Sequence, residues 1–276
     1  MIGLIVTADD FGAGVRRDEG IARAFCEGVV TGASLLPNGP SFACAARLAR
    51  DLRLPVGVHL NLSEGRPLTG DVPGLTGPDG GFPGKAGLRR ALGQGLPDPG
   101  AVLRELEAQV EQVREAGLEP DHLDTHQHFF LFPAATGLVL EAGRRAELRA
   151  VRLPRPAEPA REDPPGPLGE ELALYRRLAP KAARRVHRSG LAAPKGLWGM
   201  PLLDRLTEDS LCRTLGRLPA GCWELMVHPG YAESGNHFSG PPREVELQAL
   251  VSPAVRELIR RRDIRLACFG DLPCAC

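Results

Sequence analysis

The sequence predicts an α/β fold in which strands and helices alternate to form an irregular (β/α) barrel of seven or eight parallel strands. Short apolar runs rich in Ile, Val and Leu alternate with segments whose apolar residues recur at helical spacing. Most of the joins between them are short, which favours parallel strands connected by helices. The chain has 276 residues, of which 43% are hydrophobic, so it can fill one barrel domain spanning residues 1–276.

The first third of the chain sets this alternation. The apolar run at residues 2–7 predicts a strand, and a segment with helical spacing follows over residues 18–26 until Gly28 ends it. Residues 29–36 form a second apolar run, which stops at the Pro-Asn-Gly-Pro turn of residues 37–40. These boundaries give one strand–helix–strand unit, the building block of a parallel sheet.

The later segments repeat the same two periodicities. Ser41 is placed to cap a helix over residues 42–49, and the run at 55–62 predicts a third strand. Further strands are predicted over residues 121–125, 148–153, 196–200, 222–227 and 264–269. Further helices are predicted over residues 101–116, 134–145, 170–186, 208–217 and 243–262.

Two long segments rich in Gly and Pro interrupt the alternation, at residues 63–100 and 154–169. Each follows a predicted strand, and in a parallel barrel the loops that follow strands lie on the carboxyl-terminal rim. Irregular loops of this length in a compact domain are commonly lids or binding loops. We therefore expect both segments to be long rim loops beside a functional site.

Charge and cysteine content exclude several classes of partner. Lys and Arg total 34, as do Asp and Glu, so a net charge of zero offers no general attraction to nucleic acid or to a membrane. Seven dispersed cysteines without a CxxC pair indicate reduced thiols, and Cys274 and Cys276 have no further ligands beside them. The sequence shows no secretory signal and no stretch long enough to span a bilayer. We therefore expect a cytoplasmic protein.

Two adjacent carboxylates, Asp9 and Asp10, follow the first predicted strand. Like charges this close repel each other, and burial adds the loss of hydrating water. A bound cation would remove both costs. The pair therefore predicts a metal site at the end of this strand, with its other ligands at the ends of neighbouring strands.

Histidines stand near the ends of two further predicted strands. His59 lies in the run Val-Gly-Val-His-Leu, where a hydrogen-bonded core histidine is the alternative interpretation. In the other strand Asp124, His126 and His128 alternate, so all three would face the same way. Such a face suits a wet barrel mouth that holds a cation, and the alternative is a polar strand end that faces solvent.

Parallel strands would bring Asp10, His59 and His126 together on one rim. One carboxylate and two imidazoles fit a divalent metal with open coordination positions, which can polarise a carbonyl and lower the pKa of a bound water. A hydrolase built on such a site also needs a base and an acid. Asp9 is the candidate base. His228, at the end of a late strand before Pro-Gly, is the candidate acid, with a capping or core histidine as the alternative.

These residues stand in seven ordered motifs that resemble the YdjC family, the ChbG-type carbohydrate deacetylases, over nearly the whole chain. The motifs are TADDFG at 7–12, VVT at 29–31, NG at 38–39, GVH at 57–59, SEGRPL at 63–68, HLDTHQH at 122–128 and HPG at 228–230. The segments RRDEG at 16–20 and NLSEGRP at 61–67 are most similar to the YdjC deacetylase homologues known from animals.

The resemblance implies a barrel of the glycoside hydrolase/deacetylase type with a divalent metal, Mg or Zn. The implied reaction is hydrolysis of the N-acetyl group of an N-acetylglucosamine-type sugar such as a chitooligosaccharide, and a homodimer is the implied assembly. By motif, Asp10, His59 and His126 match the metal ligands. Asp9 matches the base and His228 the acid.

Four further residues are expected to contact substrate or to lie behind the ligands: Asn38, Asp124, His128 and Arg152. Arg152 resembles a family arginine near the site and could hold Asp9 in its ionised form, with a rim salt bridge as the alternative. The chain departs from the family's His-x-His-x-His pattern, because Phe130 takes the place of the last histidine. That exchange leaves the role of position 130 open.

Two other functions fit the same ligand set. One is a metal-dependent hydrolase of another bond, a phosphoester or a non-sugar amide. The other is a catalytically silent sugar-binding protein, against which the presence of both Asp9 and His228 argues.

Overall fold

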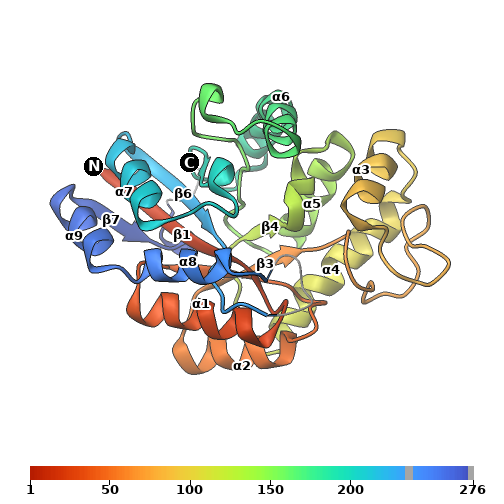
Figure 1. Cartoon of the computed structure of the whole chain (residues 1–276). Helices are drawn as coiled ribbons and strands as arrows, with labels where there is room; N and C mark the ends of the chain where they lie inside the picture. Colours follow the sequence, from red (N-terminus) through yellow and green to blue (C-terminus); the bar gives the residue numbers. More distant parts are fainter. Residues whose placement is uncertain (234–238, 273–276) are drawn as a thin grey trace.

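The predicted apolar runs pair into one parallel sheet in the computed structural model, which describes residues 1–233 and 239–272 (Figure 1). Within the described residues the sheet has seven strands: β1 Ile2–Phe11, β2 Gly32–Leu35, β3 Val56–Leu60, β4 Leu123–Thr125, β5 Leu197–Trp198, β6 Gly221–Val227 and β7 Ile264–Ala267. The strand order is β4-β3-β2-β1-β6-β5. β1 is the centre, because β6 pairs with most of its length, β7 with its first half and β2 with its second half.

The two ends of this order are linked by a short irregular segment. The strand predicted over residues 148–153 is present only as isolated bridges, in which Val151 pairs with Leu123 of β4 and Ala150 pairs with Ala192. Just after it, Pro156 pairs with Leu197 of β5. Prolines at 154 and 156 lack the N–H that a ladder needs, so these bridges do not continue into a regular strand after residue 153. The sheet curls into an irregular barrel, as predicted, and isolated bridges replace a full strand between β4 and β5.

Helices cover the outside of the sheet, with α1 and α2 side by side below it in Figure 1. They are α1 Val15–Glu27, α2 Phe42–Leu52, α3 Gly84–Gln94, α4 Pro99–Glu115, α5 Pro133–Arg145, α6 Pro167–Ser189, α7 Glu208–Arg217, α8 Pro242–Leu250 and α9 Pro253–Arg261. Short 3-10 helices are η1 His126–Leu131, η2 Ala160–Glu162, η3 Met200–Leu202 and η4 Phe269–Asp271. Six of the predicted helices are confirmed: the one over residues 208–217 has the bounds of α7, and the other five have shifted ends.

The helix predicted over residues 243–262 is wrong as a single element, because it is divided into α8 and α9. Pro253 removes a backbone donor and clashes with a continuing helix, so the chain must restart. Ser252 caps the new helix, since its Oγ accepts a hydrogen bond from the Ala254 N–H at 3.1 Å. The apolar periodicity carried across this break and concealed it.

The segment 63–100 is not a continuous loop, because it contains α3. Its Gly-rich composition concealed the helix from sequence interpretation. Its first part is fixed to α4: the buried Glu105 accepts hydrogen bonds from the N–H groups of Leu68 and Thr69 at 3.0 and 2.9 Å. Gln109 likewise bonds the backbone N–H and C=O of Asn61. This rim segment is therefore anchored by buried polar side chains.

Alternation along β1 separates the outer core from the barrel interior. Leu4 and Val6 pack in the large apolar cluster between the sheet and the helices, whereas Ile5 belongs to a small second cluster that includes Phe269. Asp9 stands on the same face as Ile5, because side chains alternate along a strand. The interior is thus apolar near the amino ends of the strands and polar near their carboxyl ends, where the predicted site residues lie.

Glu158, in the segment 154–169, makes stability depend on pH. It is buried, its Oε1 accepts the Gly199 N–H at 2.6 Å, and its Oε2 has no partner among the described residues. Burial raises the pKa of Glu158 to about 7. Glu158 therefore stabilises the fold fully at pH values below the pKa that its carboxyl has in the unfolded chain. This stabilisation is lost as the pH rises through about 7.

We expect Glu158→Gln to remove this loss. The difference in free energy of unfolding between variant and parent should grow in favour of the variant by up to about 3 kcal/mol between pH 4.5 and pH 8. Urea unfolding at several pH values measures it. A difference that stays constant with pH would contradict the assignment.

The described cysteines are free thiols, namely Cys26, Cys44, Cys212, Cys222 and Cys268, while Cys274 and Cys276 lie outside the described residues. Across residues 1–233 and 239–272, each helix is too short or too polar to cross a membrane.

Candidate active site and metal centre

A cavity of about 450 Å³ opens where the carboxyl ends of the strands meet. Its lining includes all five predicted catalytic and metal-binding residues: Asp9, Asp10, His59, His126 and His228. Asn38 and His128, from the outer predicted set, also line it. Asp124 and Arg152 are buried behind this lining. The volume lies within the roughly 300–1,000 Å³ of small-molecule sites.

The end of β1 turns two neighbouring carboxylates toward the same cavity. Successive strand residues normally point to opposite faces. Here the pairing of β1 with β2 shifts register between Ala8 and Phe11, and Asp10 has a positive φ of 62°. This irregularity allows Asp9 and Asp10 both to line the cavity.

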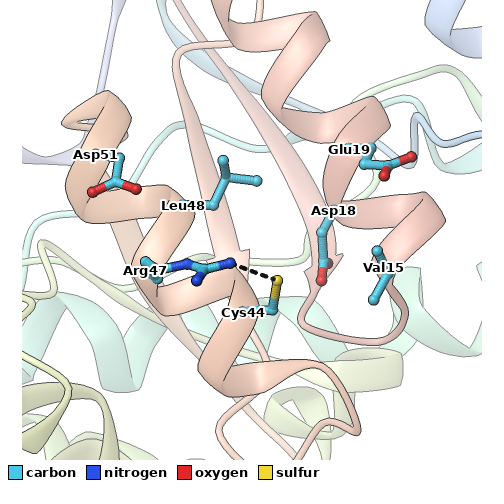
Figure 2. Close-up of a pocket in the computed structure, with 7 residues that line it drawn as sticks. All are labelled: Val15, Asp18, Glu19, Cys44, Arg47, Leu48 and Asp51. Carbon is cyan, nitrogen blue, oxygen red and sulfur yellow. Dashed lines mark hydrogen bonds between the residues drawn. The ribbon is translucent and has the colours of Figure 1, made fainter.

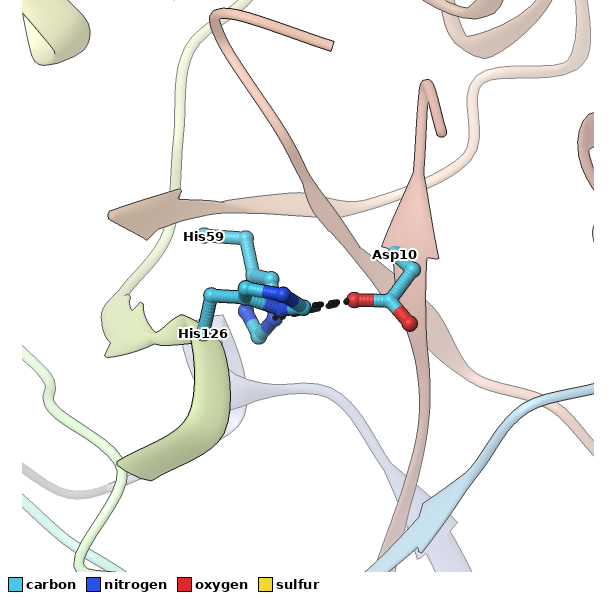
Figure 3. Close-up of side chains that lie close together, drawn as sticks. All are labelled: Asp10, His59 and His126. Carbon is cyan, nitrogen blue, oxygen red and sulfur yellow. Dashed lines mark hydrogen bonds and ion pairs between the residues drawn. The ribbon is translucent and has the colours of Figure 1, made fainter. Parts of the chain in front are cut away.

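Asp10, His59 and His126 converge on one point from three strand ends (Figure 3). Asp10 Oδ1 lies 3.4 Å from His59 Nε2 and 3.0 Å from His126 Nδ1. The two imidazole nitrogens lie 3.3 Å apart. Ligands that each sit about 2.0–2.2 Å from one zinc ion have such mutual separations.

The hydrogen bonding of His59 supports a metal at this point. Its Nδ1 lies 2.8 Å from Asp124 Oδ1, so with a metal bound Nδ1 would carry the proton and Nε2 would present its lone pair on the side of Asp10 and His126. Metal-binding histidines are held by carboxylates in the same way. A second possible ligand group, Asp9, His59 and Asp124, fits a metal less well, because the Arg152 guanidinium already contacts both carboxylates.

Charges around the three ligands shift their pKa values in opposite directions. Burial opposes ionisation of Asp10, but His126, His59 and Arg17 lower its pKa well below the usual value. Burial also opposes a charged His59, but Asp124, Asp10 and Asp9 raise its pKa to about 10. The site is therefore electronegative enough to attract a cation, whether a proton or a metal ion.

Asp124 joins three groups behind the ligands. Its Oδ1 contacts His59, as described above. Its Oδ2 accepts a hydrogen bond from Ser34 Oγ at 2.7 Å and forms an ion pair with Arg152 Nη1 at 2.6 Å. The Ser34 and Arg152 contacts fix the carboxylate, and the carboxylate in turn fixes the His59 ring.

We expect Asp124→Asn to lower metal affinity by about 10–100-fold, because an amide holds the His59 ring without the charge. Competition of zinc between the protein and a chelating dye measures it. Asp121→Asn is the matched control, since Asp121 Oδ1 lies 2.6 Å from Nδ1 of the buried His122, which is outside the ligand group. Equal metal affinity in the Asp124 variant and the parent would show that Asp124 does not support the ligands.

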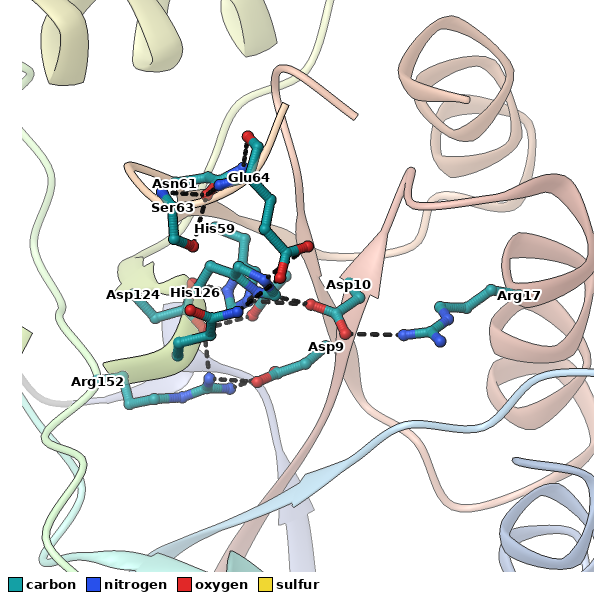
Figure 4. Close-up of polar contacts among 12 residues, drawn as sticks. Asp9, Asp10, Arg17, His59, Asn61, Ser63, Glu64, Asp124, His126 and Arg152 are labelled. Carbon is teal, nitrogen blue, oxygen red and sulfur yellow. Dashed lines mark hydrogen bonds and ion pairs between the residues drawn. The ribbon is translucent and has the colours of Figure 1, made fainter. Parts of the chain in front are cut away.

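Arg152 lies among three buried carboxylates, those of Asp9 and Asp124, which Figure 4 shows beside it, and that of Glu224. It donates to both oxygens of Asp9 at 2.7 Å, and its Nε donates to Glu224 Oε1 at 2.8 Å. Burial raises the pKa of Asp9, while Arg152 and His59 lower it in part. The predicted contact between Arg152 and Asp9 is present, and it is a buried bidentate pair rather than a rim salt bridge.

His228 reaches the cavity from the end of β6. Its side chain is buried, and burial together with Arg243 and Arg17 lowers the pKa of its imidazole well below the usual value. The Asp10 carboxylate opposes this shift. The lowered pKa favours the neutral imidazole as the resting form of His228 and makes its protonated form a strong acid.

The strand alternation expected for Asp124, His126 and His128 does not continue past the end of the predicted strand at residue 125. β4 stops at Thr125, and η1 follows, with Gln127 and His128 at positive φ values of 55° and 57°. The side chains therefore do not alternate on one face: His126 joins the ligand group, whereas His128 packs edge-on against Tyr175 at 5.4 Å. The prediction that Asp124, His126 and His128 share one face is wrong, because the left-handed backbone at Gln127 and His128 is incompatible with a strand.

Two more predicted positions, Asn38 and Phe130, lie outside the ligand group. Asn38 donates to the carbonyls of Glu64 and Arg66 and accepts from Asn61 Nδ2, so it fastens the rim segment at the edge of the cavity. Phe130 is 1% exposed and packs in the core. The position of the family's third histidine therefore does not line this cavity.

Several site residues escaped sequence interpretation. Arg17 donates to Asp10 Oδ2 at 2.7 Å, and Glu64 lies 3.5 Å from His126 Nε2. Lys85 and Glu171 form an ion pair of 2.7 Å in the cavity wall. Arg17 and Glu64 stand in the motifs RRDEG and SEGRPL, and Glu224 had a signal of its own, because a carboxylate inside an apolar strand requires a buried partner.

A second hollow, of about 360 Å³, lies between α1 and α2 (Figure 2). The predicted site residues do not line it, and its one drawn hydrogen bond joins Arg47 to Cys44 Sγ. The chemistry is therefore concentrated in the cavity at the strand ends.

The fold and the cavity define a class: α/β-barrel proteins with a possible Asp/His metal site at the carboxyl-terminal rim. Within that class the chain belongs to the YdjC-like protein family, whose model matches residues 3–261. A carbohydrate deacetylase of Mus musculus is 37% identical, with 98% of this chain and 95% of that protein covered. A chitooligosaccharide deacetylase of Salmonella enteritidis PT4 is 31% identical, with 98% of each covered.

Among solved structures, the fold is similar to that of an Enterococcus faecalis V583 protein whose name proposes cellobiose-phosphate cleavage. The TM-score is 0.76 with 25% identity, and 97% of each chain is covered. The family and the fold class predicted from the motifs are both confirmed.

Proposed function

We propose that this protein is a metal-dependent carbohydrate deacetylase that hydrolyses the N-acetyl group of N-acetylglucosamine-type sugars, chitooligosaccharides among them. The main support is the convergence of Asp10, His59 and His126 on one point in a cavity that Asp9 and His228 also line. The names of the mouse and Salmonella relatives support the reaction and the substrate class. The match of the family model to residues 3–261 supports one catalytic domain over residues 1–276.

The donor set suggests which metal would be held. Imidazole nitrogens are typical zinc ligands, whereas magnesium prefers oxygen donors and retained waters. Two imidazoles and one carboxylate therefore favour zinc. Bound at Asp10, His59 and His126, such an ion would supply Lewis-acid polarisation of the acetamide carbonyl and a lowered pKa for an attacking water.

The residues of the chain move the protons. Asp9 accepts a proton from the water that attacks the acetyl carbon, and its raised pKa makes it a stronger base than an exposed carboxylate. Arg152 holds both oxygens of Asp9, so the carboxylate cannot rotate away. When the C–N bond breaks, His228 in its protonated form gives a proton to the departing sugar amine, and the lowered imidazole pKa makes that form a strong acid. Asp9 then releases the proton taken from water to solvent, and His228 takes up a proton from solvent before the next turnover. The products are acetate and a free amino sugar.

The test is a mass-spectrometric screen of N-acetylated chitooligosaccharides for loss of one acetyl group, with metal content measured in parallel. Loss of acetyl together with stoichiometric metal supports the proposal. Phosphate release from model phosphoesters without deacetylation would favour the phosphoesterase alternative. Tight sugar binding without product over hours would identify a silent sugar-binding protein.

A further inference from the structure

The backbone of His228 is held from both sides by two side chains of α8. The His228 N–H donates to Glu246 Oε1 at 2.7 Å, and the His228 carbonyl accepts from Arg243 Nη1 at 3.2 Å. Both side chains are buried, with exposed fractions of 3% for Glu246 and 1% for Arg243. One residue of the cavity therefore has its two peptide groups bound by charged side chains away from solvent.

The two clamping side chains also hold each other. Arg243 and Glu246 are three residues apart on α8, so they share a face of the helix, and Arg243 Nη1 lies 3.1 Å from Glu246 Oε2. The other guanidinium nitrogen, Nη2, pairs with Asp204. Fixing Arg243 at both ends leaves it little freedom to follow a displaced His228 carbonyl.

The turn after His228 is enclosed as well. The Gly230 N–H donates to the Arg243 carbonyl at 3.3 Å. On its other side α1 packs so closely that a Cβ on Gly20 would lie 2.4 Å from the Gly230 Cα. The segment from His228 to Gly230 is therefore confined between α1 and α8.

Apolar contacts alone could attach α8 to β6 at lower cost. Buried charges lose hydration, and even a well-made buried ion pair is commonly no more stabilising than apolar residues of the same size. Two buried charges directed at a single residue are better explained by positional control, since a displacement of about 1 Å can lower a catalytic rate on the order of 10²-fold.

We propose that Glu246 and Arg243 are positioning residues that fix His228 through its backbone, so that its imidazole stays in reach of the departing amine. The catalytic part of this inference rests on the proposed function, in which His228 is the proton donor. The clamp itself concerns hydrogen bonds to the His228 peptide groups, and its test is separate from turnover.

The experiment uses the full chain with its metal and compares Glu246→Ala with Glu246→Gln. We expect the Ala variant to speed hydrogen exchange of the His228 amide by at least about tenfold, because its acceptor is lost. We expect kcat for deacetylation to fall by about 10–100-fold while KM changes less than about twofold. The Gln variant keeps an acceptor oxygen and should recover most of both.

Two controls separate positioning from general damage. Glu244→Ala removes an exposed carboxylate of the same helix that accepts the Ala232 N–H at 2.9 Å, and it should change neither reading. In a His228→Ala background, Glu246→Ala should lower kcat by less than about twofold more, because the side chain it positions is gone. If Glu246→Ala does not fold, Arg243→Lys gives the kcat and KM readings from the carbonyl side, and exchange of the His228 amide is measured in Glu246→Gln against the parent.

Unchanged exchange of the His228 amide in Glu246→Ala would overturn the clamp. If Glu246→Ala lowers kcat as much in the His228→Ala background as it does in the parent, the positioning role is overturned. If the parent protein releases no acetate, the catalytic part fails together with the proposed function, and the exchange measurement still decides whether the clamp exists.

Discussion

Replacing Asp9 with Asn should abolish acetate release while the protein keeps its metal. Asp9 is outside the group of Asp10, His59 and His126, so its loss leaves the three ligand atoms in place. An amide cannot take a proton from water, and loss of a general base lowers kcat by about 10²–10⁴-fold. Steady-state kinetics and metal analysis on the same preparation measure both expectations.

The charge removed in Asp9→Asn also stabilises Arg152, so lost activity needs a matched control. Glu224→Gln serves, because Glu224 contacts the same guanidinium, with Arg152 Nη2 2.7 Å from Glu224 Oε1, yet does not line the cavity. Both variants should lower the free energy of unfolding, since each leaves a buried guanidinium short of a carboxylate. Only Asp9→Asn should lose catalysis. Near-parental acetate release by Asp9→Asn would show that Asp9 is not the base.

Replacing His126 with Ala should remove the metal itself. His126 Nδ1 is within 3.0 Å of Asp10 Oδ1, so the variant deletes one of three converging ligand atoms. We expect metal affinity to fall by more than the roughly 10–100-fold that a residue behind the ligands contributes. Inductively coupled plasma mass spectrometry after dialysis, and a zinc competition titration, give the two measurements.

His128→Ala is the matched control for His126→Ala, because the two histidines are two residues apart and both line the cavity. His128 packs against Tyr175 and is outside the ligand group, so its variant should keep full metal occupancy. The opposite pattern, with metal kept in His126→Ala and lost in His128→Ala, would assign the ligand to His128 and overturn the geometry described above.

The fold followed from periodicity wherever a strand or helix was regular. The prediction from periodicity failed where prolines overrode the pattern. Prolines at 154 and 156 keep the isolated bridges before them from continuing as a regular strand, and Pro253 divides a helix whose apolar face continues. At α3 the prediction failed because it missed an element: glycines concealed a helix that packing stabilises.

The sequence by itself determined the family, the alternating α/β architecture and the three candidate ligands. The ligands were accessible because Asp10, His59 and His126 stand at or just after strand ends, and the ends of parallel strands meet at one rim. That inference needs only the order of elements along the chain.

Only the tertiary structure decided how those residues act together. The separation of His128 from the ligand group depends on positive φ values after β4, which no hydrophobic pattern encodes. Partners that no pattern predicted, Arg17 for Asp10 and Glu246 for the His228 backbone, are brought to the site by packing. Periodicity describes which face of one element is buried, whereas a buried charge finds its partner through the packing of the whole chain.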